Sequence, residues 1–447
     1  MTRPSLWWVG RDLRLADNPA LSAAAAAGPV IPVAVLDDAT VPPGAAAQWR
    51  LGQSMHSLDA RLRDLGSRLV VRRGDARTTL AGLLADTGAQ AIHLCDPHPF
   101  FAVPQGLPLV LHPANNLMAS GTLATGAGTP YRRFTPFWKS LRARPIAAPL
   151  DTAPVPAPAD WPAGLDPADW DLGAAMNRGA AVLARHARIG EAAARQRLDA
   201  FLADSLSAYG TDRDRPDRPL GTSGLSDALA LGEISARSIW HAVLDRGGPG
   251  AETFLSELGW RDFARDLMRH SPDMGRQNWN RDWDGFPWQA DNPQAEAWRR
   301  AQTGIDMVDA GMREMYVTGR MHNRVRMIAA SFLTKHLLTD WRVGTRWFDD
   351  TLIDWDPASN AMNWQWVAGS GPDAAPYFRV FNPDSQGDRF DPSGRYRAHW
   401  LTGPGADAFA EAAPRAWRVD PRRRPPPVVT LAAGRQRALE AYAIARR

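Results

Sequence analysis

The sequence predicts an α/β domain with a doubly wound parallel sheet, joined by a long linker to an all-helical domain. Three observations predict this arrangement in the 447 residues. Short apolar runs alternate with helical patterns over the first 150 residues. A stretch at 145–164 holds six prolines among alanines, and strand patterns nearly vanish from about residue 180. Such an order of elements is typical of two domains of different class.

The first part of the chain contains both element types in alternation. Five apolar runs are expected to form buried strands, at 6–9, 30–36, 68–71, 91–95 and 107–111. Three helical patterns lie between them, at 20–27, 49–65 and 78–87. This order predicts a mainly parallel sheet with helices on both faces. No G-x-G-x-x-G follows the first strand, so a dinucleotide fingerprint is not supported there.

The rest of the chain is expected to be linker and helix. We place the α/β domain at 1–144, a Pro/Ala-rich linker at 145–179 and the helical domain at 180–447. A proline-rich segment of this kind is extended and semi-rigid. The clearest helical patterns after it lie at 192–203, 234–245, 252–269, 305–316 and 320–339.

Composition excludes several classes of protein. The net charge is only +4, but 50 of the 52 basic residues are Arg, which is compatible with a nucleic-acid partner and also with a GC-rich genome. The single cysteine, Cys95, excludes an internal disulfide framework and a cysteine-cluster metal site. No signal-peptide pattern and no apolar membrane span is present, so we expect a cytoplasmic protein without metal.

Tryptophan is unusually frequent, with 19 residues against 6 Tyr and 14 Phe. Thirteen of the tryptophans lie from Trp240 to Trp417, so the excess belongs to the second half. Such an excess suits a large helical core, stacking surfaces for bases or a relay of redox-active rings. Composition alone does not separate these three possibilities.

Residues 221–226, with the sequence GTSGLS, form a small hydroxyl-rich loop before a helical pattern. Free backbone N–H groups and hydroxyls at a helix start suit a phosphate or pyrophosphate group. The same residues also suit an ordinary Ser/Thr cap of the helix. The loop alone leaves both interpretations open.

Two predicted helices each carry a set of polar side chains on one face. Glu257, Trp260 and Arg261 are three and four positions apart, so they could recognise a planar ligand or form a core Trp beside an ion pair. In 321–327, which is also expected to be helical, Asn323 and Met327 share a face. The surrounding region 311–346 has seven basic and two acidic residues, which suits either a phosphate-facing or a solvated surface.

A further polar cluster precedes two tryptophans. Asp354, Asp356 and Asn360 lie just before Trp364 and Trp366. The cluster suits a ligand site beside aromatic rings, or an N-capped helix with a buried aromatic anchor.

Together these motifs resemble the photolyase–cryptochrome family over nearly the whole chain. The similar stretches are GRDLRLADN at 10–18, YRRFTPF at 131–137, the segment 303–341, and AAPYFRVFNP at 374–383 followed by Gln386 and Gly387. The resemblance implies non-covalent FAD in the helical domain, active as FADH⁻. It also implies a cavity for a lesion flipped out of double-stranded DNA.

The resemblance assigns one set of residues to FAD. Its phosphate contacts match Tyr209, Thr222, Ser223, Gly224, Leu225 and Ser226. Many relatives carry Arg or Lys in place of Gly224, so we expect one phosphate contact to be weaker or replaced. Arg261 and Asn323 are also expected beside the cofactor.

Four further residues match positions around the isoalloxazine ring. Arg326 and Asp354 match a pair packed against the ring, where a guanidinium offsets the cost of burying an anion. Asp356 matches a carboxylate near N3, and Asn360 matches the residue facing N5. An amide offers both a donor and an acceptor, so it can bond N5 whether or not that atom is protonated.

The resemblance also divides the tryptophan excess. Trp364, Trp341 and Trp288 match a relay that photoreduces the flavin. Trp260 and Trp366 match the rings that wedge the lesion, and Glu257 matches the carboxyl that bonds its polar edge. The remaining DNA or cavity contacts are expected at Arg213, Arg261, Asn323, Arg324, Met327 and Gln386.

The cavity residues point to one branch of the family. The combination of Glu257, Trp260, Asn323, Met327 and Trp366 resembles class I cyclobutane-dimer photolyases. The resemblance thus implies a monomer that repairs cyclobutane pyrimidine dimers by light-driven electron transfer and is nucleoid-associated when bound to DNA. The alternative is a cryptochrome-type blue-light receptor without repair activity, and a photolyase for single strands or other lesions comes after it.

One departure from the family concerns the light-harvesting antenna. Relatives usually carry an additional helix after the strand that ends at Cys95, and that helix helps to wall the antenna groove. Here only 96–106, with three prolines and no helical pattern, separates the two strands. We therefore expect the antenna chromophore to be absent or atypical.

Overall fold

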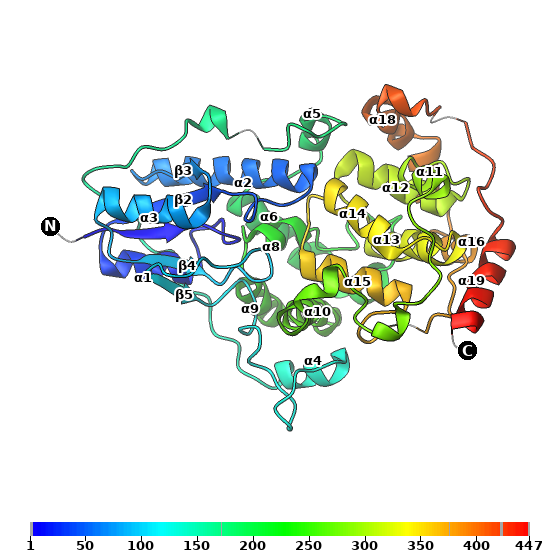
Figure 1. Cartoon of the computed structure of the whole chain (residues 1–447), viewed down its shortest axis with the longest axis horizontal. Helices are drawn as coiled ribbons and strands as arrows, with labels where there is room; N and C mark the ends of the chain where they lie inside the picture. Colours follow the sequence, from blue (N-terminus) through cyan, green and yellow to red (C-terminus); the bar gives the residue numbers. More distant parts are fainter. Residues whose placement is uncertain (1–2, 171, 375, 421–422, 446–447) are drawn as a thin grey trace.

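The computed structural model describes residues 3–170, 172–374, 376–420 and 423–445. Ala375, within the family-like stretch 374–383, lies outside the described residues. The first part of the chain forms a five-stranded, fully parallel sheet in the order β3-β2-β1-β4-β5 (Figure 1). Its strands are β1 (Ser5–Trp8), β2 (Val30–Leu36), β3 (Val70–Arg73), β4 (Ile92–Cys95) and β5 (Leu109–His112).

Helices cover both faces of this sheet, as predicted. Side chains alternate along β1, so Trp7 packs in a core with α1 (Pro19–Ala27) and α2 (Ala45–Asp64). Leu6 and Trp8 face the opposite core, to which α3 (Ala76–Thr87) contributes Leu80 and Leu83. The doubly wound sheet is therefore confirmed, and the observed strands and helices lie within four residues of their predicted bounds. The expectation that all five strands are buried was wrong for β5, which lies at the sheet edge and exposes Val110 and Leu111.

The connection from β4 to β5 contains no helix. Residues 96–108 form turns and extended backbone, as the three prolines predicted. After β5 the chain leaves the sheet, and α4 (Phe134–Arg142) packs against α10 (Ala251–His270) (Figure 1). Phe137 and Leu141 of α4 share a core with Phe263 of α10. The last part before the predicted linker thus packs with the helical half of the molecule.

The predicted linker runs back over the α/β part. Val155 and Trp170 are buried in the same core as α1 and α2, and the N–H of Val30 at the start of β2 donates to the carbonyl of Pro156 at 2.8 Å. The domain bounds that we placed at 144 and 179 stay a prediction.

The remainder of the described chain is helical, and the isolated bridge between Gln289 and Thr339 is its one strand-like pairing. Two large cores organise it, and α15 (Pro357–Ala368) contributes Met362 to one and Trp364 to the other. The helices are α5 (Ala180–Ala184), α6 (Glu191–Asp204), α7 (Tyr209–Asp212), α8 (Ser226–Leu231), α9 (Ala236–Arg246), α10 (Ala251–His270), α11 (Pro293–Arg299), α12 (Asp306–Thr318), α13 (Asn323–Ser331), α14 (Trp341–Thr351), α15 (Pro357–Ala368), α16 (Pro383–Phe390), α17 (Arg395–Leu401), α18 (Pro404–Ala412) and α19 (Leu431–Ala445).

The helix predicted at 320–339 is shorter than expected. Gly319 adopts φ 69° and ends α12, and residues 320–322 then form a non-helical connection. His322 caps α13, because its Nδ1 accepts a hydrogen bond from the N–H of Arg324 at 3.2 Å. The helix continues into a π-helical turn at Phe332–His336. The expectation that Met321 and His322 are helical was therefore wrong.

The described residues contain neither a candidate membrane span nor a candidate metal site. No helix in these ranges is both long and apolar enough to cross a membrane. Likewise, no group of three or more His, Cys, Asp and Glu side chains in the described part could hold a metal ion.

Candidate functional site

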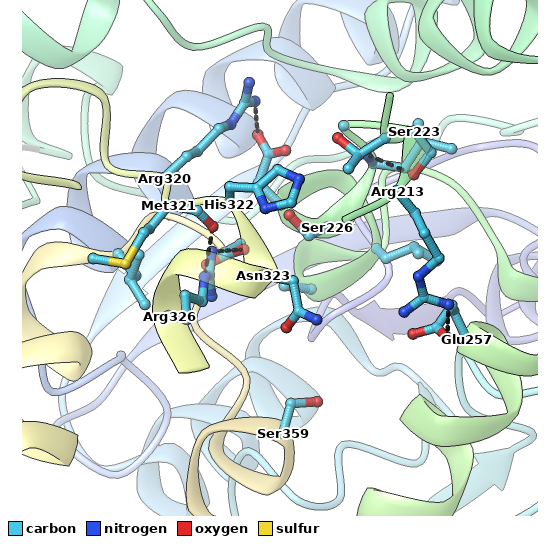
Figure 2. Close-up of a pocket in the computed structure, with 18 of the residues that line it drawn as sticks. Arg213, Ser223, Ser226, Glu257, Arg320, Met321, His322, Asn323, Arg326 and Ser359 are labelled. Carbon is cyan, nitrogen blue, oxygen red and sulfur yellow. Dashed lines mark hydrogen bonds and ion pairs between the residues drawn. The ribbon is translucent and has the colours of Figure 1, made fainter. Parts of the chain in front are cut away.

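One large cavity, of about 1030 Å³, opens in the helical half of the molecule (Figure 2). Its wall is built from side chains of α6, α10, α13 and α15 and from the loop before α8. Eighteen of the residues singled out in the sequence line it together, namely Tyr209, Arg213, Thr222, Ser223, Gly224, Leu225, Ser226, Glu257, Trp260, Arg261, Asn323, Arg326, Met327, Asp354, Asp356, Asn360, Trp364 and Trp366. Residues far apart in sequence thus meet at one site.

The hydroxyl-rich loop 221–226 forms one part of this wall. Gly224 has φ 64°, a left-handed conformation that a side chain rarely adopts. The loop does not cap α8 in the usual way, because Leu225 is the residue before the helix and makes no side-chain cap. Tyr209 lines the same cavity and is buried, and burial raises the pKa of its hydroxyl. The hydroxyls of the loop are therefore not consumed in capping the helix.

A guanidinium that the sequence did not single out lies against this loop. Arg197 of α6 donates from Nε to the carbonyl of Ser223 at 2.5 Å and from Nη2 to the carbonyl of Thr222 at 2.8 Å. It lines the same cavity as the loop. Arg197 is remote from the loop in sequence, so no spacing pattern could have connected the two.

Arg326 and Asp354 form the predicted pair. Nη2 of Arg326 lies 2.7 Å from Oδ2 of Asp354, and its Nε donates to the carbonyl of Met321 at 2.8 Å. Oδ1 of Asp354 is buried and has no hydrogen-bond partner among the described residues. The pair therefore fixes a cationic group in the cavity wall and leaves one carboxylate oxygen unsatisfied.

Asp356 is held from two sides by the protein. Its Oδ1 accepts from the N–H of Ser359 at 3.0 Å, which caps α15, and its Oδ2 accepts from Nη2 of Arg265 at 2.9 Å. Burial raises the pKa of Asp356, but Arg265 and Arg261 outweigh it and hold the pKa below its usual value. The carboxylate is therefore ionised, and the capped-helix interpretation of 354–360 is confirmed.

Arg261 was expected at both the cofactor and the DNA. Its guanidinium donates to the backbone carbonyls of Asn115 and Leu229, and its side chain is only 11% exposed. Burial, followed by the neighbouring charge of Arg265, lowers the pKa of Arg261 to about 9. Arg261 lines the cavity but is not placed at an exposed rim, so this position does not support a DNA contact.

Asn360 is oriented by a residue that the sequence did not single out. Its Nδ2 donates to Oδ1 of Asp349 at 2.7 Å and to the carbonyl of Thr345 at 3.3 Å. The same Asp349 oxygen accepts from Nε1 of Trp355 at 2.6 Å. Both amide hydrogens of Asn360 are therefore taken by α14, and its carbonyl oxygen is the group left for a ligand.

Glu257 and Trp260 lie on neighbouring turns of α10, as predicted. Arg213 reaches Glu257 and forms an ion pair with it, and both side chains are partly exposed to the cavity (Figure 2). The ring of Trp260 stacks on Phe134 of α4, with centroids 3.7 Å apart and an interplanar angle of 10°. Phe134 thus supports one face of the indole at the cavity wall.

Asn323, Met327 and Trp366 complete this part of the wall. Two other predicted contacts lie elsewhere. Arg324 does not line the cavity; it pairs with Asp214 at 2.8 Å and covers the ring of Phe390. Gln386 lies on α16, also away from the cavity wall. The structure therefore brings only part of the predicted DNA set to the cavity.

The three tryptophans predicted to form a relay differ in burial, from the cavity wall to the half-buried Trp288. Trp364 lines the cavity, while Trp341 is completely buried and donates from Nε1 to Asn278 at 2.9 Å. Gly344, one turn after Trp341, gives Trp364 room against α14. Trp288 is half-buried, and Gln289 beside it bonds with the backbone of Leu338 and Asp340, just before Trp341. The chain thus gathers all three rings around the start of α14.

The cavity has the chemistry that FAD requires. Its wall offers the hydroxyls of the loop 221–226 and the guanidinium groups of Arg197 and Arg320, which suit phosphates. The same wall carries the Arg326–Asp354 pair and the carbonyl of Asn360. Oδ1 of Asp354 and Nε1 of Trp364 are buried without a partner among the described residues, so a polar ligand would satisfy them.

Comparison with known proteins also indicates an FAD-binding protein of the photolyase type. Residues 5–97 match a family model described as DNA photolyase, and residues 254–444 match the FAD binding domain of DNA photolyase. A deoxyribodipyrimidine photo-lyase of Agrobacterium fabrum is 40% identical, over 99% of this chain and 98% of that protein.

Two solved structures extend this comparison over the whole fold. A class III photolyase from Agrobacterium tumefaciens superposes with a TM-score of 0.91 at 39% identity, covering 100% of this chain and 98% of its own. A cryptochrome from Synechocystis superposes with a TM-score of 0.82 at 27% identity, covering 99% and 100%.

These comparisons also bear on the branch of the family. The expected likeness to class I photolyases is not supported, because the structure with 39% identity is described as class III. The family itself is shown by the match over nearly the full length of both chains. This chain belongs to the photolyase–cryptochrome family.

Proposed function

We propose that this protein is a deoxyribodipyrimidine photo-lyase that uses light to repair cyclobutane pyrimidine dimers in double-stranded DNA. One observation carries the proposal: a single cavity is lined both by the residues expected to hold FAD and by Glu257, Trp260 and Trp366, which are expected to hold the lesion. Relatives of that name at 36–40% identity over most of the chain support the assignment.

The residues around the flavin side of the cavity have distinct tasks. FAD, when bound in its reduced form, would supply the light-driven, reversible one-electron chemistry that opens the cyclobutane ring. Arg326 and the ionised Asp356 would set the charge around a bound flavin ring, and the carbonyl oxygen of Asn360 would accept a hydrogen bond from it. Tyr209 and the hydroxyls of Thr222, Ser223 and Ser226 would hold its phosphates. No general acid–base pair is required of the protein.

The lesion side must recognise two flipped-out bases that have lost their stacking partners. Trp260, braced by Phe134, and Trp366 supply flat apolar faces, while Met327 fills the wall between polar groups. Glu257 and Asn323 offer hydrogen bonds to the base edges. Arg213, paired with Glu257, lies close enough to neutralise this carboxylate and to meet the DNA backbone.

The class and the antenna form a further part of the proposal. We assign the protein to class III rather than class I, supported by the Agrobacterium tumefaciens structure. Since no helix separates β4 from β5, the antenna chromophore is absent or bound in an atypical manner. The absorption spectrum of the purified, full-length protein tests this: a stoichiometric folate or deazaflavin band contradicts it.

The function is tested with an irradiated double-stranded oligonucleotide. The chemically reduced monomer is illuminated, and remaining dimers are counted with and without light. Light-dependent loss of dimers is expected, and it should fall sharply in Glu257→Gln, which keeps the shape of the side chain but not its charge. Glu252→Gln, an exposed residue at the start of the same helix, is the matched control. If illuminated, reduced protein leaves the dimers intact, the blue-light receptor alternative is favoured.

A further inference from the structure

Arg197 is bound to the loop 221–226 only through backbone carbonyls. Its Nε and Nη2 donate to the carbonyls of Ser223 and Thr222, and its Nη1 makes no hydrogen bond to a described residue. No carboxylate in the described part of the chain forms an ion pair with it, although most cavity arginines have one. The guanidinium therefore lines the cavity without a carboxylate partner, and its Nη1 is free of hydrogen bonds to described residues.

Gly224 and Arg197 fit each other closely. A β-carbon at position 224 would lie 2.9 Å from Nε and 3.4 Å from Cζ of Arg197. Any side chain at this position would therefore displace the guanidinium, besides being strained by φ 64°. The absence of a side chain at Gly224 therefore leaves room for the guanidinium of Arg197. The positive charge beside the loop comes from α6, because the loop itself has no basic residue.

The surroundings of Arg197 carry excess positive charge. Arg188 and Arg320 line the cavity beside it, and Asp227, a carboxylate in the same wall, is already shared between Arg320 and Arg50 at 2.8 and 3.2 Å. Burial first, and then Arg188 and Arg320, lower the pKa of Arg197. A bound anion would relieve this repulsion, and the hydroxyls of Ser223 and Ser226 lie in the same wall (Figure 2).

We propose that Arg197 binds the pyrophosphate of FAD, as the replacement for a basic side chain on the loop itself. The proposal rests on the FAD site proposed above and adds a cofactor-binding residue to it. A guanidinium held by two carbonyls is already oriented, so little side-chain entropy is lost when its free N–H groups meet phosphate oxygens.

Binding of flavins to the full-length protein, after removal of its flavin, tests this proposal. Arg197→Gln keeps an amide that can still donate to the loop carbonyls but removes the charge. We expect its Kd for FAD to rise roughly 10- to 100-fold, the range for a charge-assisted hydrogen bond. Its Kd for riboflavin, which has no phosphate, should stay unchanged. Arg197→Lys should recover part of the FAD affinity.

The control and the contrary outcomes separate the possibilities. Arg195→Gln removes the same charge from an exposed position of α6 that does not line the cavity, and it should bind FAD like the parent. Unchanged FAD affinity in Arg197→Gln, or an equal loss for FAD and riboflavin, overturns the proposal and leaves Arg197 a structural support of the loop. If the parent protein binds no FAD at all, it is the proposed function that fails.

Discussion

The amide of Asn360 is fixed by the carboxylate of Asp349, whose Oδ1 accepts its Nδ2 hydrogen bond at 2.7 Å. The sequence predicted a side chain that could either donate to or accept from flavin N5. In the structure only the carbonyl oxygen of Asn360 is left for a ligand, because the second hydrogen on Nδ2 is donated to the carbonyl of Thr345. Asn360 can therefore act only as an acceptor. An acceptor suits N5 when it carries a hydrogen, as it does in the reduced flavin. Asp349 therefore acts as a positioning residue.

Replacing Asp349 by Asn should weaken the preference for reduced flavin. The new amide can donate to Oδ1 of Asn360, so Asn360 can turn its own N–H groups to N5. The loss of one hydrogen bond, worth about 1 kcal/mol, corresponds to a roughly fivefold change in the equilibrium. Aerobic reoxidation of the chemically reduced protein, followed by flavin absorbance, should accelerate by a similar factor. Asp350→Asn, the same change one residue later, is the control, and equal rates in both variants contradict the role.

Trp341→Phe should abolish photoreduction of the flavin but leave repair intact when the protein is reduced chemically. Phenylalanine fills most of the buried volume, but its ring is much harder to oxidise than indole. Photoreduction is followed by flavin absorbance under blue light with an external reductant. Trp240→Phe, a change at a buried Trp in the other helical core, should photoreduce normally. Full photoreduction in Trp341→Phe means that electrons take another route.

Gly344→Ala should damage the contact between α14 and Trp364. The added methyl group would overlap the six-membered ring of Trp364, which has no free space on that side. Overpacking of this kind costs about 1–3 kcal/mol, and it should also move Trp364 in the cavity wall. The midpoint temperature of thermal unfolding and the rate of flavin photoreduction should both fall. Gly82→Ala in α3, where nothing lies within 4 Å of the new methyl group, should be neutral or slightly stabilising.

The elements were predictable because their patterns are local. The alternation of Leu6, Trp7 and Trp8 between two cores follows from the geometry of a strand, and the apolar runs marked all five strands. The helix predicted at 320–339 began too early for a local reason as well. Gly319 ends α12 and His322 caps α13, whereas the apolar periodicity predicts a helix that already includes 320–322.

The partners within the site were not predictable from spacing. Arg197 meets Gly224, Asp349 meets Asn360 and Phe134 meets Trp260 only because different helices fold onto one cavity. The family resemblance supplied residues predicted to contact a ligand, including the Arg326–Asp354 pair, but it did not give Arg197 or Asp349 as supporting residues. Those supporting contacts depend on tertiary packing, which local patterns do not contain.

Asp262 links α10 to the segment that follows the sheet and is expected to make stability depend on pH. Its Oδ2 accepts from the N–H groups of Leu117 at 2.8 Å and Met118 at 3.1 Å. Its Oδ1 is buried without a hydrogen bond to a described residue. Burial raises the pKa of Asp262 from 3.8 to about 6, although Arg261 and the Met118 N–H oppose this. Between these two values the folded protein holds a proton that the unfolded chain releases.

The free energy of unfolding should therefore fall as the pH rises through this interval, by up to roughly 1.4 kcal/mol per pH unit. Asp262→Asn keeps an oxygen for both N–H groups and cannot ionise, so it should lose this slope. Relative to the parent, it should gain stability between about pH 4 and pH 7 in thermal or urea unfolding. Asp245→Asn, at an exposed position of α9, should track the parent at every pH. A constant difference between Asp262→Asn and the parent would show that Asp262 does not titrate in this range.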